Sequence, residues 1–174
     1  MLQTSEPGIG EFALVRAAQA GDRAAFGALY GQFARLVHGI LLSHVSYTDA
    51  EDLMQDVFVR AMEQISVLRE PAAFGGWLAS IARRAAFDYH RRMRLVTALP
   101  DTIPSNRNPD GEAFEVLALV QRLPESYRET LVLRLVEGMT GPEIAARTGL
   151  TADSVRVNLC RGMKLLRERL QEKR

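Results

Sequence analysis

The chain has 174 residues, of which 47% are hydrophobic and 25% charged, the composition of an ordinary globular protein with one medium or two small domains. A single cysteine excludes an intrachain disulfide and a cysteine-built zinc site, and the N-terminal residues lack the basic start and apolar run of a signal peptide. No apolar stretch approaches membrane-spanning length, so we expect a protein of the reducing cytosol that does not insert into a membrane.

The net charge of +1 conceals blocks of alternating sign along the chain. Residues 1–70 carry a net −4, residues 71–100 a net +4, residues 101–117 a net −3 and residues 118–174 a net +4. An ordinary globular surface mixes its charges. Segregation of this kind indicates separate partners of opposite charge.

Helical spacing of apolar residues runs through most of the chain, and strand-like alternation is nearly absent, which predicts an all-α fold. A first amphipathic segment begins at Phe12 and ends at Gly21, and Asp22 is placed to cap the next helix. That helix is predicted to direct its large apolar residues inward: Phe26, Leu29, Tyr30, Phe33, Val37 and Ile40.

The helix predicted from Asp49 to about Leu68, capped by Ser46 or Thr48, combines an apolar stripe with an acidic ridge. At about 100° per residue, a sector roughly 60° wide holds the four carboxylates Asp49, Asp52, Asp56 and Glu63, with Gln55 beside them. Like charges at these spacings destabilise an isolated helix, so the ridge suits a basic protein partner. The alternative is that acidic residues in the first turns of the helix complement its dipole, which accounts for Asp49 and Asp52 but not for Glu63.

After Pro71 a further helix carries an apolar stripe that starts at Phe74, with Trp77 at the edge of the stripe. A largely opposite sector gathers basic residues around one aromatic ring: Arg83, Arg84, Phe87, Arg91 and Arg94. Arginines supply phosphate contacts, and an aromatic side chain among them can stack on an unpaired base. The alternative is a solvated polar face.

Residues 95–112 hold three of the seven prolines and no helical period, which predicts an exposed, acidic linker. The sequence therefore divides into a helical module over residues 1–94 and a second helical module over residues 113–174.

Residues 141–162, GPEIAARTGLTADSVRVNLCRG, have the spacing of a helix-turn-helix. Pro142 starts a short helix, Gly149 is placed for the left-handed turn residue, and Thr151 or Asp153 can cap the second helix. The N-terminal residues of that second helix then face a major groove. The motif predicts DNA binding without revealing which kind of DNA-binding protein this is.

Taken together, these segments resemble a bacterial RNA polymerase sigma factor of the extracytoplasmic-function (ECF) type, a member of the housekeeping-type sigma family with regions two and four in order. DAEDLMQDVFVRA looks like the region-two helix that binds the coiled coil of the polymerase β′ subunit. FGGWLASIARRAAFDYHRR looks like the adjoining helix that opens and binds the minus-ten element. The stretch from RLPESYRETLV to LLRERL looks like region four, which binds the minus-thirty-five element.

The resemblance assigns roles to particular side chains. For core RNA polymerase it implies Asp49, Asp52, Gln55 and Asp56. For the minus-ten element it implies the loop residues Ser66, Val67, Leu68 and Arg69 and the helix residues Arg83, Arg84, Phe87 and Arg91. For the minus-thirty-five element it implies Thr151, Ser154, Arg156, Asn158 and Arg161.

The resemblance also implies partners and a cellular setting. The chain would bind core RNA polymerase through the β′ coiled coil and the β subunit, direct promoter recognition and melting under stress, and catalyse no reaction. An anti-sigma factor would control the chain. The chain would be cytoplasmic: it would lie at the nucleoid when bound to polymerase, or be held at the membrane by the anti-sigma factor. Four positions depart from the family pattern and bear on promoter preference rather than on class: Met62, Ser80, Arg84 and Asn158.

Two other classes of function stay open at this point. A stand-alone regulator with an unrelated sensor would explain the helix-turn-helix but not the acidic ridge or the basic helix. An enzyme is disfavoured because the three histidines and Cys160 lack metal-ligand or nucleophile–base spacing and no glycine-rich phosphate loop occurs. We therefore expect no catalysis, no metal and no cofactor, while Cys160 leaves oxidative control open.

Overall fold

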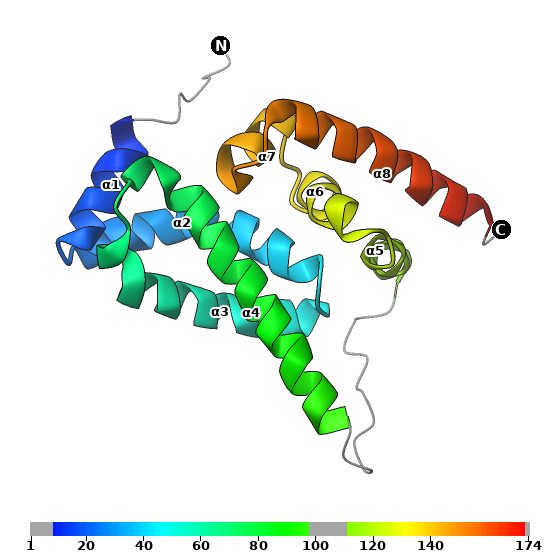
Figure 1. Cartoon of the computed structure of the whole chain (residues 1–174), viewed down its shortest axis with the longest axis horizontal. Helices are drawn as coiled ribbons and strands as arrows, with labels where there is room; N and C mark the ends of the chain where they lie inside the picture. The colour runs from blue at the N-terminus through cyan, green and yellow to red at the C-terminus, as the bar shows by residue number, and fades with distance from the viewer. Residues whose placement is uncertain (1–8, 98–110, 173–174) are drawn as a thin grey trace.

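The computed structural model describes residues 9–97 and 111–172, which form α-helices and two short 3₁₀ helices (Figure 1). No β-strand occurs within these two ranges, and the prediction of an all-α fold is confirmed. In chain order the elements are α1 (Ile9–Gln19), α2 (Arg23–Leu42), α3 (Tyr47–Gln64), η1 (Ile65–Val67), η2 (Pro71–Ala73), α4 (Phe74–Thr97), α5 (Glu112–Gln121), α6 (Glu125–Leu135), α7 (Gly141–Thr148) and α8 (Ala152–Glu172).

The N-terminal module, defined as α1 to α4, is built around α2. Gly21 adopts a φ of 93°, and the Asp22 carboxylate then accepts hydrogen bonds from the backbone N–H groups of Ala24 and Ala25, so the predicted cap is confirmed. The predicted inward stripe is buried except at Phe26, which is half-buried, and at Tyr30, which is 39% exposed and contacts Phe58 with ring centroids 4.4 Å apart. Its ring packs against Phe58 while part of the side chain stays in solvent, as amphipathic side chains often do.

The fourth helix is longer than the sequence pattern predicted. α4 continues to Thr97, three residues past the predicted end at Arg94, because no helix-breaking residue precedes Pro100. At the other end α5 already begins at Glu112, so the predicted linker of 95–112 is too long on both sides. Its residues 98–110 lie outside the described residues.

The C-terminal module, defined as α5 to α8, contains the predicted helix-turn-helix. A capping box between Thr140 and Glu143 starts α7, Gly149 ends it with a φ of 78°, and the Thr151 hydroxyl accepts a hydrogen bond from the Ser154 N–H at the start of α8. Gly162 lets α8 approach α6, since a Cβ at this position would lie 2.9 Å from Leu131 Cδ1.

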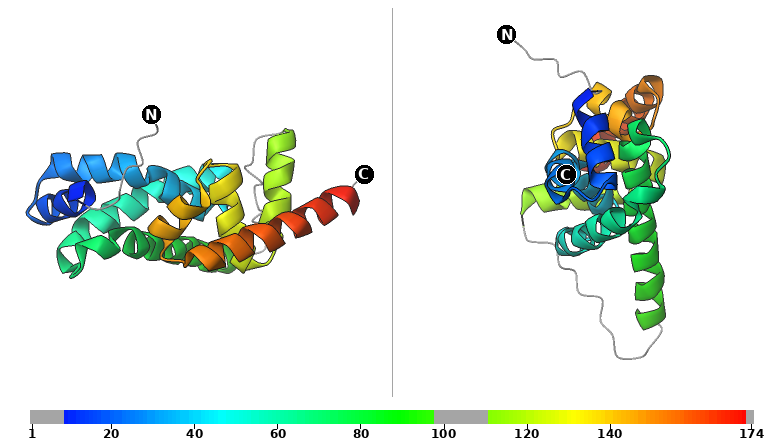
Figure 2. Two further views of the ribbon diagram at one scale, coloured as in Figure 1. Left: turned by 90° about the horizontal axis from the view of Figure 1, so that it is seen from above. Right: turned by 90° about the vertical axis from the view of Figure 1, so that its left-hand side faces the viewer.

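The two modules pack against each other, with α2 against α6 and α4 against α7 (Figures 1 and 2). Gly39 makes the first contact possible, because a Cβ there would lie 2.6 Å from Leu133 Cδ2 and 2.9 Å from Glu137 Cγ. The Gln121 amide donates to the carbonyls of Leu42 (2.8 Å) and Val45 (2.9 Å), which satisfies backbone acceptors near the end of α2. The sequence pattern did not predict this docking.

Arg147 fixes the second contact between the modules. Its guanidinium donates to the Gln32 carbonyl at 2.7 Å and lies 4.7 Å from the centroid of the Phe33 ring. Gly75 faces it closely, because a Cβ at Gly75 would lie 3.0 Å from the Arg147 carbonyl oxygen. The first helix of the helix-turn-helix is thereby held on the N-terminal module.

Candidate functional site

The outward side of α3 carries the predicted acidic ridge. Asp52, Gln55, Asp56 and Glu63 are all exposed, and the apolar residues Val59 (51% exposed) and Met62 (48% exposed) also lie open on this helix. Carboxylates beside exposed apolar side chains form a surface suited to a basic protein partner, because such a partner gains both apolar burial and charge pairing.

Asp49 differs from the rest of the ridge. It is half-buried, and Ser46 hydrogen-bonds both its backbone N–H, at 3.2 Å, and its carboxylate. Ser46 is thus the cap of α3, and Asp49 belongs to the first turn that this cap closes. A structural role therefore accounts for Asp49, as the helix-dipole interpretation allowed.

The loop between α3 and α4 presents Ser66, Val67 and Arg69 to solvent, while Leu68 is half-buried. Gln19, the last residue of α1, holds this loop: its amide nitrogen donates to the carbonyls of Ile65 (3.0 Å) and Leu68 (2.7 Å). Sequence reasoning missed Gln19, because nothing in the helical period of α1 marks its last residue as the partner of a loop 46 residues later.

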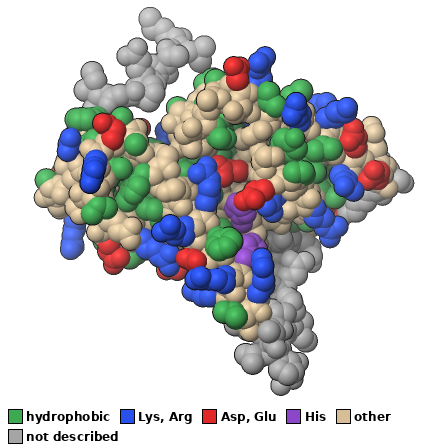
Figure 3. Space-filling view, in the orientation of Figure 1, with side chains coloured by type: hydrophobic (Ala, Val, Ile, Leu, Met, Phe, Trp, Pro, Cys, Tyr) green, Lys and Arg blue, Asp and Glu red, His purple; other side chains and the backbone are tan. Residues whose placement is uncertain are grey.

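The exposed side of α4 brings together three of the four predicted minus-ten residues on that helix, Arg84, Phe87 and Arg91. Phe87 is 68% exposed, an unusual position for a phenylalanine, and it lines a surface pocket of about 370 Å³ with Arg91, Arg94 and Leu95. Arg84 is exposed as well, and Figure 3 shows basic side chains gathered over this helix. A ring among arginines can stack on an unpaired base while the guanidinium groups meet phosphates.

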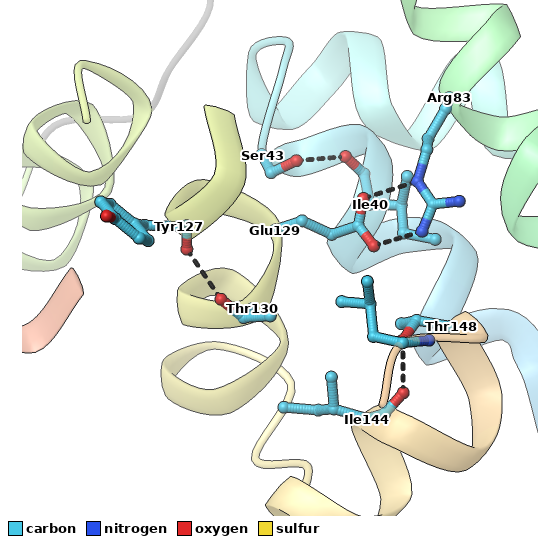
Figure 4. Close-up of polar contacts among 9 residues, drawn as sticks. Ile40, Ser43, Arg83, Tyr127, Glu129, Thr130, Ile144 and Thr148 are labelled. Atoms are coloured by element: carbon cyan, nitrogen blue, oxygen red, sulfur yellow. Dashed lines mark hydrogen bonds and ion pairs between the residues drawn. The ribbon is translucent and has the colours of Figure 1, made fainter. Parts of the chain in front are cut away.

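Arg83 is separated from this group by an ion pair with the other module. Its Nε and Nη2 donate to the two carboxylate oxygens of Glu129 on α6, at 2.8 and 2.6 Å (Figure 4). The hydrogen bond from Glu129 raises the pKa of Arg83. The predicted DNA-contacting arginine thus already binds an anion, in the bidentate geometry with which guanidinium also binds phosphate.

The start of α8 carries the predicted minus-thirty-five residues. Thr151, Ser154 and Arg161 are exposed on one sector of the helix, with Asn158 half-buried at its edge. Arg156 projects about 140° away from Arg161 around the helix and lies 3.1 Å from Asp153. Arg156 therefore lies outside the sector that the other four side chains share.

Comparison with known proteins matches both modules to one family. Residues 29–95 match the model of sigma-70 region 2, and residues 113–166 match that of sigma-70 region 4. The RNA polymerase sigma factor CarQ of Myxococcus xanthus is 34% identical over 161 residues, which cover 87% of this chain and 92% of CarQ. The chain belongs to the ECF-type RNA polymerase sigma factors.

Other sigma factors agree with this assignment. The ECF sigma-E factor of Haemophilus influenzae is 27% identical, with 91% of this chain and 94% of that protein covered. The ECF sigma factor BldN of Streptomyces coelicolor is 30% identical over 88% of this chain, which spans 63% of BldN. In its complex with the cytosolic domain of CnrY, CnrH superposes with a TM-score of 0.66 at 26% identity, covering 95% of this chain and 100% of CnrH. The prediction of an alternative sigma factor is confirmed.

Among the helices described for this sigma factor, none has the length and apolarity to cross a membrane.

All three histidines of the sequence lie near the boundary between its two modules. His38 Nδ1 is 2.6 Å from Glu137 Oε1, and His90 Nε2 donates to the His44 carbonyl at 2.9 Å. Figure 3 shows histidine side chains next to acidic ones where the modules meet.

Burial lowers the pKa of His44 below its ordinary value of 6.5, and the charge of Arg128 lowers it further. Glu129 and Glu125 act in the opposite direction, and His90 adds a weak lowering. The folded chain therefore disfavours the charged form of His44.

Replacement of Gln19 by methionine removes both hydrogen bonds to the loop while keeping the length of the side chain. We expect faster hydrogen exchange in residues 65–70, because two part-buried carbonyls lose their donor at a cost of about 1–3 kcal/mol. The matched control is Gln55→Met, a change at an exposed position of α3 that should leave the loop unchanged. Equal exchange rates in the loop of Gln19→Met and wild type would contradict the anchoring role.

Replacement of His44 by glutamine should change how stability depends on pH. Above pH 6.5 both the folded and unfolded chains hold His44 neutral, whereas below it the unfolded chain takes up a proton that the folded chain resists. The urea midpoint of wild type should therefore fall relative to that of His44→Gln as the pH drops below 6.5. A difference between the two proteins that stays constant from about pH 8 to pH 5.5 would refute this expectation.

Proposed function

We propose that this sigma factor binds core RNA polymerase with α3 and promoter DNA with α4 and α8, and so directs initiation to a stress-responsive class of promoters. The observation that carries the proposal is the pairing of two opposite surfaces on one module. Exposed Asp52, Gln55 and Asp56 lie on α3, while exposed Arg84, Phe87 and Arg91 lie on α4. A stand-alone regulator has no use for the first surface, whereas a factor that brings polymerase to DNA needs both.

The proposed role in DNA melting relies on binding energy. Phe87 offers a ring to a base that has left the duplex, and stacking of this kind is worth about 1–3 kcal/mol per base. The loop of Ser66, Val67, Leu68 and Arg69, held by Gln19, is the proposed pocket for such a base. No catalytic group takes part in this mechanism.

The C-terminal module is proposed to bind the minus-thirty-five duplex with the start of α8. Thr151 and Ser154 lie at the N-terminus of that helix, where backbone N–H groups and small hydroxyls suit phosphate contacts. Arg161 and Asn158 lie farther along the same sector and suit contacts to base edges.

We further propose that the chain contacts both the β′ and the β subunits of polymerase and that an anti-sigma factor controls it. CnrH, the structural relative, was solved with the cytosolic domain of CnrY, which supports control by a protein partner. Such a partner could hold the factor at the membrane until a stress releases it to the nucleoid.

Charge reversal of the acidic ridge tests the polymerase surface. Asp52→Lys combined with Asp56→Lys should weaken binding to purified core RNA polymerase at least about tenfold, because like charges across an interface cost several kcal/mol. Run-off transcription from the promoter upstream of its own gene should fall in parallel, while the C-terminal module should still bind DNA. Glu168→Lys with Glu172→Lys makes the same charge change at exposed positions of α8 and serves as control. Undiminished polymerase binding by the α3 variant would remove the ridge from the proposal.

Replacement of Arg156 by alanine tests the minus-thirty-five surface. If Arg156 contacts a phosphate, binding to the duplex should weaken and the slope of log K against log salt should decrease by about 0.9. Arg169→Ala removes the same charge from the far end of α8, where Arg169 pairs with Glu172 at 3.5 Å, and should leave the slope nearly unchanged. A slope for Arg156→Ala equal to that of wild type would exclude the phosphate contact.

A further inference from the structure

One large apolar side chain is exposed near the middle of the helix that is proposed to enter the major groove. Val157 is 38% exposed, and the other large apolar residue exposed on the described part of α8 is Leu170, near its far end. Val157 follows the buried Val155 by two positions, which turns it about 200° around the helix. It therefore projects away from the core of the C-terminal module.

Packing within the fold does not account for this valine. α8 packs on α5, α6 and α7, all within the C-terminal module, and Figure 1 shows it along the outer edge of the molecule. Valine is also a poorer helix former than alanine, because its branched side chain loses rotamer freedom in a helix. Neither burial nor helix formation therefore explains an apolar, branched residue at position 157.

Polar and basic side chains surround Val157. Those that project within about 60° of it, at about 100° per residue, are all exposed: Asp153, Ser154, Arg161 and Lys164. Single exposed apolar residues are common on protein surfaces, so exposure alone indicates nothing. The position of this one is informative, because it is the middle of the surface that the helix-turn-helix is proposed to present to DNA.

The side chains that precede Val157 already serve the first turn of α8. The Thr151 hydroxyl donates to Ser154 Oγ at 2.8 Å and accepts from the Ser154 N–H at 3.1 Å. Asp153 lies 3.1 Å from the Arg156 guanidinium. Base-specific contacts of the outward surface therefore fall to the residues one turn farther on, where Val157 lies.

An exposed valine matches one group in the major groove. Among the four bases of DNA only thymine carries an apolar group there, the C5 methyl, and apolar side chains recognise thymine through it. Arg161, four residues after Val157, lies about 6 Å farther along the helix axis, which is comparable with the rise of two base pairs. Arginine binds the O6 and N7 atoms of guanine. The two side chains therefore fit a site in which a thymine lies within about two base pairs of a guanine.

We propose that Val157 is a specificity-determining residue of this sigma factor, which recognises a thymine of the minus-thirty-five duplex by packing against its C5 methyl group. The inference rests on the proposed function, since it takes α8 as the helix that binds this duplex, and it adds both a side chain and the base that this side chain selects. Because the contact needs no hydrogen bond, the analogue that tests it is uracil, which pairs as thymine does but lacks the methyl group.

The test uses holoenzyme reconstituted from core RNA polymerase and the full chain. Fragments of the genome that encodes the chain are first selected for binding and transcription by this holoenzyme, which supplies a promoter duplex without assuming its sequence. Each thymine of its minus-thirty-five region, located from the mapped transcription start, is then replaced singly by deoxyuridine. Fluorescence anisotropy gives the affinity at a temperature too low for promoter melting. Loss of the contacted methyl group should weaken binding about fourfold at one thymine.

Val157→Ala completes a double-mutant cycle with the deoxyuridine replacement. It removes two methyl groups from an exposed position, and alanine favours the helix, so the fold should persist. The variant should bind the unmodified duplex about fourfold more weakly than wild type and should no longer distinguish thymine from deoxyuridine at that site. Leu170→Ala also shortens an exposed apolar side chain of α8, and it should keep the wild-type ratio of the two affinities.

The outcomes separate this inference from the proposed function. A wild-type affinity unaffected by deoxyuridine at every thymine would overturn the methyl contact but leave the proposed function intact, since the promoter duplex is still bound. A Val157→Ala protein that keeps the wild-type ratio would overturn it as well, and a uniform loss of affinity would then indicate a contact of Val157 with protein. Failure of the holoenzyme to select and transcribe any fragment would overturn the proposed function, and the inference with it.

Discussion

The arrangement depends on α2 being covered on more than one side. Ile40, Leu41 and Leu42 are consecutive and each at most 1% exposed, although three consecutive helical positions span directions about 200° apart. The N-terminal module can cover only part of such a helix, and α6 covers more of it through the contact at Gly39. Burying a leucine contributes about 1.5–3 kcal/mol, so the apolar residues of α2 contribute strongly to holding the two modules together.

The Arg83–Glu129 pair adds specificity to this apolar contact more than it adds stability. Withdrawing two charges from water offsets most of their attraction, so a well-formed buried pair is close to neutral compared with an apolar contact. Removing one member is different, because Glu129, 13% exposed, would be left without its donors. The pair therefore helps to fix where α6 lies relative to α4.

Local features were predictable from sequence because they depend on neighbouring residues. Asp22 as a cap and Gly149 as a left-handed residue follow from a few adjacent positions. Contacts that join distant segments left no such pattern: Gln19 reaches a loop 46 residues away, and Arg83 reaches Glu129 across the same separation. A pattern for the docking was nonetheless present, since an apolar run at residues 39–42 cannot face a single direction.

The family of the chain could be inferred from the order of its motifs. The roles of individual side chains depended on their burial in the fold, which the helical spacing of the sequence does not show. Asp49 shares the ridge sector of α3 but serves the cap with Ser46, and Tyr30 shares the inward stripe of α2 yet reaches solvent. The predicted end of α4 failed for another reason: loss of amphipathic period does not end a helix when no breaking residue follows. Periodicity therefore predicts which side of a helix is apolar better than where the helix stops.

The blocks of charge along the chain do not show how individual charges are placed in the fold. The C-terminal segment is net positive, yet two of its acids, Glu129 and Glu137, are turned toward the N-terminal module, where they meet Arg83 and His38. Most of its exposed cations lie on α8, and two others, Arg122 and Arg134, are exposed at the end of α5 and on α6. The blocks of charge predict partners of opposite sign, but a block average cannot show that an anion paired with the basic helix is carried by the same chain. Because that anion is carried by the same chain, it acts on Arg83 at a high local concentration.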